Sequence, residues 1–163
     1  MTQLEALKRE LEREAVTTRK MLSRVPADKF DWKPHEKSMT VKTLATHVAE
    51  LPTWIGMVLN ADELDFEKSP YKPVDVKSTE ELVKHFEQSL EDGRKQIATG
   101  REEVLDKQWT LRSGDTIFTV ESKRDFLRMT FSQVIHHRAQ LGVYLRLLNI
   151  PIPGSYGPSA DEQ

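Results

Sequence analysis

The residues in this 163-residue chain that could do chemistry are its histidines, and two of them are adjacent. His136 and His137 lie within segment 131–148, which has the most apolar helical pattern in the sequence. An imidazole close to a core needs a hydrogen-bond partner or a metal ion, because burying an unpaired polar group costs free energy. This segment therefore indicates either a metal site or a buried polar network.

Helical geometry separates the two neighbouring histidines, because successive residues are turned by about 100° around a helix axis. Gln133 and His137 are four residues apart, so their side chains share one face. His136 falls on a flank with Met129 and Val143. Spacings of three and four predict that the face towards the interior consists of Phe126, Thr130, Gln133, His137, Leu141, Tyr144 and Leu148.

A third candidate, His47, lies three residues after Leu44 and borders the apolar face of another expected helix. Pro52 is predicted to kink that helix one turn after His47. If the two helices are neighbours, His47 and His137 meet in the interior. The residues alone leave two interpretations open, a metal site formed with Gln133 and a buried network in which each imidazole donates to a carbonyl or hydroxyl.

The composition narrows the possible chemistry. The chain is 37% hydrophobic and 31% charged, with a net charge of −2, which is typical of a soluble globular protein rich in amphipathic helix. Without a basic excess, we expect no nucleic-acid partner. The absence of cysteine excludes disulfides, thiolate nucleophiles and cysteine metal ligands. A metal would have to use imidazole, carboxylate, amide or water ligands.

Nothing in the sequence indicates a membrane partner. The N-terminal residues 1–14 lack the apolar core of a signal peptide. No apolar run approaches the roughly 20 residues that span a bilayer. We therefore expect a cytoplasmic protein.

The elements that would position these residues are mainly helices. Apolar periodicity, caps and breakers predict helices over 2–24, 40–60, 78–100 and 121–148. Two short β-type runs within 107–120 predict a small hairpin or an extended crossover before the last helix. The fold class expected is all-α, a four-helix bundle that occupies 1–163 as a single domain.

The remaining histidines and two arginines of the last helix receive a simpler interpretation. His35 and His85 have charged neighbours. We expect His35 to be solvated in a loop, and His85 to be solvated or at the rim of the core. Arg138 and Arg146 are expected on the helix surface, because arginines are seldom buried without a partner.

Several segments of the sequence resemble one known family. They are the run from Leu44 to Trp54 (LATHVAELPTW), the run from Ile135 to Arg146 (IHHRAQLGVYLR), the tail from Pro151 to Asp161 (PIPGSYGPSAD) and the segment from Lys33 to Met39 (KPHEKSM). Together they are similar to the DinB/YfiT-like superfamily of four-helix-bundle proteins. The resemblance extends over nearly the whole chain, and it is specific for the family and not for a reaction.

The resemblance implies a metal site. Family members carry a histidine triad, with one histidine on the second helix and two on the fourth in an H-x-x-x-H spacing. His47 matches the first, and His137 matches the last. Gln133 stands where the pattern has its remaining histidine. The implied ligands are therefore His47, Gln133 and His137, and the implied metal is zinc or nickel, although a neutral amide binds such ions less well than imidazole.

The resemblance also implies an activity. Members of the family include metal-dependent enzymes that act on low-molecular-weight thiols, such as bacillithiol S-transferases and mycothiol-dependent isomerases. The expectation is a homodimeric, metal-dependent thiol S-transferase with a small-molecule substrate and a thiol co-substrate. One alternative is a non-catalytic stress-response or small-ligand-binding bundle whose triad has lapsed. A further alternative is a metal-dependent hydrolase.

Overall fold

The structure is a computed structural model that describes residues 1–162. Its helices are α1 (Gln3–Leu22), α2 (Val41–Glu50), α3 (Trp54–Asn60), α4 (Thr79–Thr99) and α5 (Lys123–Leu147). Its strands are β1 (Glu63–Asp65), β2 (Gln108–Ser113) and β3 (Thr116–Ser122). Three short 3-10 turns also occur, η1 (Ala27–Lys29), η2 (Leu51–Thr53) and η3 (Glu102–Val104).

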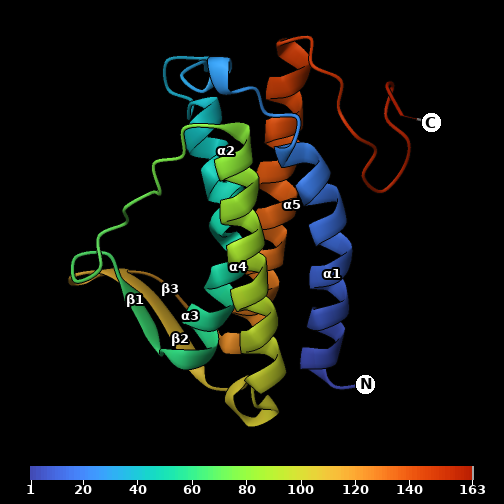
Figure 1. Ribbon diagram of the computed structural model, residues 1–163. Coiled ribbons are helices and arrows are strands. Elements are labelled where there is room, and N and C mark those ends of the chain that lie inside the picture. Colours follow the sequence, from blue (N-terminus) through green and yellow to red (C-terminus); the bar gives the residue numbers. More distant parts are fainter. Residues whose placement is uncertain (163) are drawn as a thin grey trace.

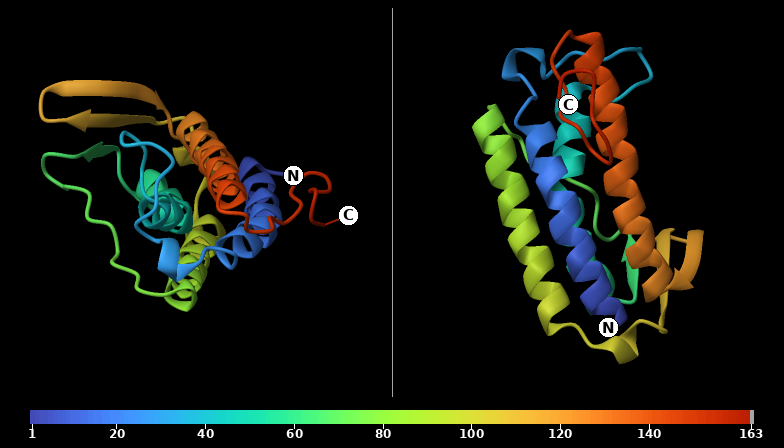
Figure 2. Two further views of the ribbon diagram at one scale, coloured as in Figure 1. Left: turned by 90° about the horizontal axis from the view of Figure 1, so that it is seen from above. Right: turned by 90° about the vertical axis from the view of Figure 1, so that its right-hand side faces the viewer.

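The long helices lie lengthwise beside one another and form a bundle (Figures 1 and 2). Side-chain caps define where they begin: Thr2, Thr40, Ser78 and Ser122 each accept a hydrogen bond from a backbone N–H of the first turn. The ends of α1, α4 and α5 fall within two residues of those predicted from the sequence. No helix within the described residues is both long and apolar enough to cross a membrane.

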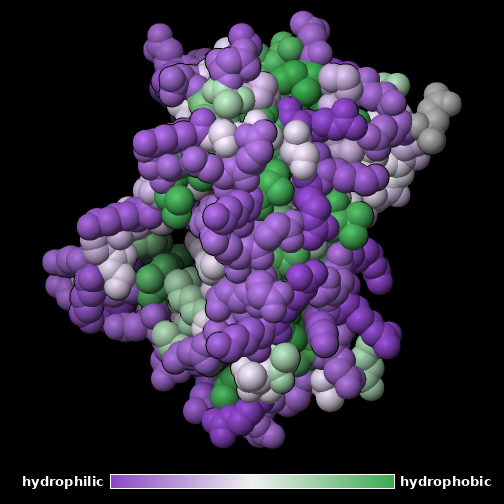
Figure 3. Space-filling model, viewed as in Figure 1, coloured by the Kyte–Doolittle hydropathy of each residue, from purple (hydrophilic) through white to green (hydrophobic). Residues whose placement is uncertain are grey.

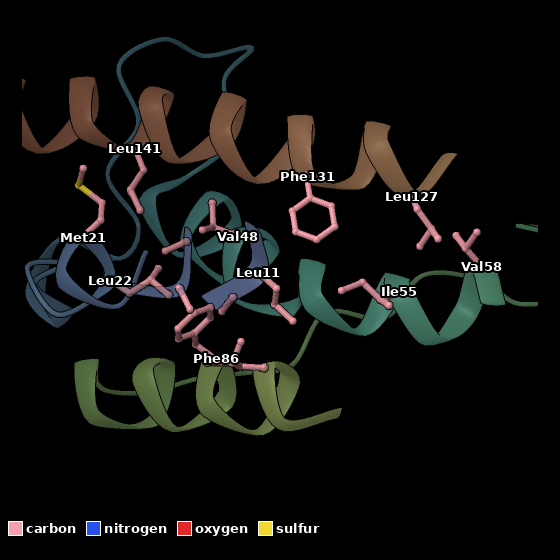
Figure 4. Close-up of a cluster of buried hydrophobic side chains, with 14 of the residues drawn as sticks. Leu11, Met21, Leu22, Val48, Ile55, Val58, Phe86, Leu127, Phe131 and Leu141 are labelled. Atoms are coloured by element: carbon pink, nitrogen blue, oxygen red, sulfur yellow. The ribbon is translucent and has the colours of Figure 1, made fainter. Parts of the chain in front are cut away.

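The core lies between these helices. Figure 4 shows Phe131 and Leu127 of α5 directed towards Ile55 and Val58 of α3, while Phe86 of α4 points towards α1. All five side chains are at most 2% exposed. Burial of such side chains contributes about 1.5–3 kcal/mol each and orders the helices that carry the candidate site.

The helix expected over 40–60 is interrupted, as Pro52 predicted. Helix α2 ends at Glu50, the turn η2 contains Pro52, and α3 resumes at Trp54. Proline has no N–H to donate within a helix, so the ladder of hydrogen bonds cannot continue through this position. Gly93 of α4 packs against the kink, where a Cβ atom would lie 2.9 Å from the carbonyl oxygen of Pro52. The glycine therefore permits the close approach of α4 to the kink.

The predicted all-α fold class is wrong, because the protein contains a three-stranded mixed sheet. Strands β2 and β3 form the antiparallel hairpin that the sequence indicated, and β1 pairs in parallel with the other edge of β2. Strand β1 is only three residues long, and its partner lies more than forty residues later. No local periodicity can reveal so short a strand, since its stability comes from the distant pairing and not from its own sequence.

The sheet is tied together at the hairpin turn by the buried side chain of Asp65. Its carboxylate accepts hydrogen bonds from the backbone N–H groups of Gly114 at 2.9 Å and Glu67 at 3.0 Å. The Gly114 bond is the main reason that the pKa of Asp65 lies below its usual range. Gly114 has a φ of 54°, which glycine adopts without strain.

The expectation that Arg138 is solvated is also wrong. Its side chain is 3% exposed and forms an ion pair with Glu14 of α1 at 2.7 Å. The guanidinium also donates to the Thr18 hydroxyl at 3.0 Å and to the Tyr156 hydroxyl at 3.1 Å. The sequence could not identify these partners, because they are 18 to 124 residues away. Arg138 therefore connects α5 to α1 and to the C-terminal segment.

We predict that Arg138→Met lowers the free energy of unfolding by about 3–5 kcal/mol, because it leaves the Glu14 carboxylate buried without its partner. The matched control is Arg128→Met on the same helix, whose ion pair with Glu10 is largely exposed. That substitution should cost about 1 kcal/mol or less. Urea unfolding of both variants measures their free energies of unfolding. Equal losses would show that the buried ion pair stabilises the protein no more than the exposed one does.

Candidate metal centre

The structure brings His47 of α2 and His137 of α5 together. Their ring centroids are 4.8 Å apart and their planes are inclined by 75°. Helices α2 and α5 pack directly against each other, which places the two rings at their interface. Both side chains are partly buried. Two residues separated by 90 positions are thus held in contact by helix packing.

Each of the two rings is oriented by a second side chain. The Nδ1 atom of His47 lies 2.8 Å from Oε1 of Glu50, and Nδ1 of His137 lies 2.9 Å from Oε1 of Gln140. Both partners are acceptors, so each Nδ1 carries the hydrogen and donates it. In that tautomer the Nε2 lone pair of each ring is available as a metal ligand. This arrangement of an oriented imidazole with a free Nε2 is common at metal sites.

The predicted interior face of α5 is only partly correct. Phe126, Thr130 and Leu141 are buried, but Gln133, His137, Tyr144 and Leu148 are half-buried. The buried line runs along the adjacent face, through Leu127, Phe131, Val134, Arg138 and Leu145. His137 therefore lies at the edge of the core and not in its centre. The three- and four-residue spacings fit both faces, so the sequence pattern did not decide between them.

Gln133, the third expected ligand, lies one turn before His137 and lines a surface cavity of about 440 Å³ with it. His136 lies on the same rim but is exposed, as its flank position predicted, with its ring centroid 4.9 Å from that of His137. Within residues 1–162, no three histidine, aspartate or glutamate side chains converge as a metal-binding group. A metal site at this place would have to use the amide of Gln133 or solvent to complete its ligands.

The environment of His137 favours the neutral imidazole. Burial is the main cause that lowers the pKa of His137, and the nearby His47 and His136 rings act in the same direction. The hydrogen bond to Gln140 opposes this shift. Since a metal binds the neutral form of imidazole, the shift is in the direction that metal binding requires.

Two further residues belong to the site, and neither was predicted from the sequence. Glu50 is 9% exposed, and its Oε1 accepts a hydrogen bond from the Tyr71 hydroxyl at 2.7 Å as well as from His47. Burial, followed by the Glu50 carboxylate, raises the pKa of Tyr71. The three-residue spacing of His47 and Glu50 could have revealed the first contact. Tyr71 lies in a loop, where no periodic pattern predicts its position.

His85 of α4 lies at the rim of the core, one of the two positions expected for it. It is half-buried, and its Nε2 atom is buried without a hydrogen-bond partner. Burial lowers the pKa of His85, while the charge of Glu50 raises it to a smaller extent. His35, in contrast, is exposed as expected.

These features define the class of protein. It is a helical bundle with a small mixed sheet, and its histidine pair lies where α2 packs against α5. The model of the DinB family matches residues 1–163, and the chain belongs to the DinB family. The superfamily expected from the sequence is thereby confirmed.

Solved structures show the same fold. A DinB-like protein from Bacillus subtilis superposes with a TM-score of 0.69 at 18% identity, covering 97% of this chain and 99% of that one. A DinB-like protein from Bacillus cereus ATCC 10987 gives a TM-score of 0.70 at 18% identity, covering 96% of this chain and 100% of that one. No curated protein matches the sequence. At these identities the likeness concerns the fold and not the reaction.

We predict that Tyr71→Phe loosens the loop 66–77, because it removes the hydrogen bond to Glu50. A hydrogen bond to a charged group contributes about 1.5–3 kcal/mol, which corresponds to an increase of roughly tenfold or more in the open population. Limited proteolysis with trypsin should therefore cut faster after Lys68 and Lys77. The control Val74→Ala, at an exposed position of the same loop, should leave the rate unchanged. Equal rates for Tyr71→Phe and the wild type would contradict the role of this contact.

Proposed function

We propose that this protein binds a divalent metal ion through His47 and His137, and that it is a metal-dependent enzyme acting on a small molecule with a low-molecular-weight thiol as co-substrate. The observation that carries the proposal is the contact of the two rings at 4.8 Å, with each Nδ1 already engaged by Glu50 or Gln140.

The donor set fits a metal of the zinc or nickel type. Imidazole nitrogens are common ligands of both ions. The two rings lie side by side, with centroids 4.8 Å apart, so both belong to one local site. Gln133, on the same helix face as His137, is the proposed third ligand through its carbonyl oxygen. Water or substrate would occupy the remaining position, as in catalytic and not structural sites.

A bound metal would hold a thiol as thiolate at neutral pH, which is the nucleophilic form. In the proposed reaction the thiolate sulfur forms a bond to an electrophilic carbon of the acceptor. The leaving group departs with the bonding electrons, and the proton of the thiol is released to solvent. Glu50 keeps the His47 ring in one orientation, and Gln140 does the same for His137. The chain itself has no cysteine, so the sulfur has to arrive with the co-substrate.

The second candidate function is a non-catalytic stress-response or small-ligand-binding bundle without a metal. Gln133 favours this alternative, because its amide replaces the histidine that the resemblance implies. A metal-dependent hydrolase remains the further alternative, since an open coordination position can also activate water. The homodimer and the cytoplasmic location expected from the sequence stay predictions.

We predict that the protein, purified without a metal-affinity column and reconstituted, binds zinc or nickel stoichiometrically. His47→Ala and His137→Ala should abolish this binding, because each removes one of two imidazole ligands. His136→Ala, at the neighbouring position, is the matched control and should still bind the metal. Glu50→Gln should weaken binding by about 10–100-fold, the usual effect of losing the partner of a ligating histidine. Gln133→His should strengthen it.

Calorimetric titration and elemental analysis provide the measurement. No metal in the wild type after reconstitution with excess ion would exclude both enzyme candidates and favour the ligand-binding bundle. A loss in His136→Ala that exceeds the loss in His137→Ala would contradict the assignment of His137.

We further predict thiol-dependent turnover in the metal-loaded protein. A small thiol together with an electrophilic acceptor should give a thioether product, detected by mass spectrometry. His137→Ala should reduce the rate to that of the solution reaction, because the thiol would no longer be held as thiolate. Metal-dependent turnover of an ester or amide without any thiol would instead support the hydrolase.

A further inference from the structure

A small cavity lies beside the histidine pair, and His47 forms part of its wall. Its volume is about 240 Å³, and it is lined by Met39, Thr43, His47, Trp54, Phe66 and Tyr71. Figure 3 shows a hollow on this side, between the loop and the body of the bundle. Helices α2 and α3 provide one wall, and the residues after β1 provide the opposite wall.

The kink at Pro52 and the loop after β1 create this cavity together. Thr43 and His47 are one turn apart on α2, and Trp54 begins α3 beyond the kink, with its ring centroid 5.8 Å from that of His47. Phe66 is supported from the hairpin by Phe118, at a centroid distance of 6.3 Å. Tyr71 is fixed by its hydrogen bond to Glu50.

Most of the polar groups in the wall are already engaged within the protein, the exceptions being Nε2 of His47 and the indole N–H of Trp54. The Thr43 hydroxyl pairs with that of Thr40 at 2.9 Å, and Nδ1 of His47 and the hydroxyl of Tyr71 both pair with Glu50. None of the six lining residues is a lysine, an arginine or a carboxylate. A ligand group inside the cavity would therefore find mainly aromatic and thioether surface and no side chain of opposite charge, so a charged group would lose most of its hydration without an ion pair to compensate.

Size limits the ligand further. A cavity of about 150 Å³ in another protein holds benzene, so about 240 Å³ accommodates one ring with a few substituents. Aromatic walls favour stacked or edge-on contact with a planar group. Met39 and Tyr71, at the mouth, are 45% and 50% exposed, which leaves apolar area that a ligand would cover.

We propose that this cavity binds an uncharged, apolar group of the size of one substituted ring, and that this group belongs to the acceptor substrate. The assignment to the acceptor rests on the proposed function, because it assumes that the reaction takes place at the adjacent histidine pair. The binding itself does not depend on metal, since none of the contacts above involves an Nε2 atom of the pair.

The test uses the full-length, metal-free protein and 4-fluorotoluene as the probe, observed by fluorine NMR. The signal should shift saturably, and the indole N–H resonance of Trp54 should shift with it. The charged probe 4-fluorobenzoate has the same ring and should not bind. Thr43→Phe, at an exposed position of α2, should fill the cavity and abolish the shift, and Met39→Phe should weaken it. Thr99→Phe, on an exposed site of α4 outside the cavity, is the matched control and should bind like the wild type.

Two outcomes would overturn the proposal. One is the absence of saturable binding by 4-fluorotoluene to a protein whose fold is intact by circular dichroism. The other is binding that Thr43→Phe and Met39→Phe leave unchanged. If the probe binds as predicted while zinc and nickel do not bind, the cavity assignment stands and the proposed metal-dependent reaction fails. If metal binds and the probe does not, the cavity assignment fails and the proposed metal site stands.

Discussion

The buried carboxylate of Glu50 is the constraint on which the candidate site depends. A carboxylate that is 9% exposed has to be paired, and Glu50 is paired by His47 and Tyr71 at one oxygen atom. The first contact fixes the tautomer and orientation of the ring that meets His137. The second holds the loop that forms the outer wall of the apolar cavity. One side chain therefore couples the geometry of the histidine pair to the shape of the adjacent binding space.

Helix packing also determines the geometry of the histidine pair. The kink at Pro52 turns α3 away from the line of α2, and Gly93 allows α4 to approach the kink closely. Helix α5 is also held to α1 by the buried pair of Arg138 and Glu14. His137 is the residue immediately before Arg138, so the interaction that secures the helix in the bundle also sets the position of the histidine on its edge. Stability and site geometry thus depend on the same short segment of α5.

The sequence predicted the long helices, the kink and the hairpin, because each has a local signal in periodicity, capping residues or turn residues. Strand β1 was missed, since a three-residue strand is stabilised by pairing with β2 far along the chain. Spacing correctly placed His136 on the exposed flank and led to the prediction that His47 and His137 meet. The same spacing was wrong about the buried line of α5, and Arg138 was wrongly expected in solvent. Tyr71 and the cavity arise from loop contacts that no local pattern encodes.

The proposed site requires His47 and His137 to bind one metal ion through Nε2. X-ray absorption spectroscopy on the nickel- or zinc-loaded protein tests it most directly, because ordered imidazole ligands give a distinctive outer-shell scattering signal. We expect two imidazoles per metal at about 2.0–2.1 Å, with oxygen ligands completing the shell. A spectrum of the wild type with oxygen ligands alone, without imidazole scattering, would show that the two histidines do not bind the metal.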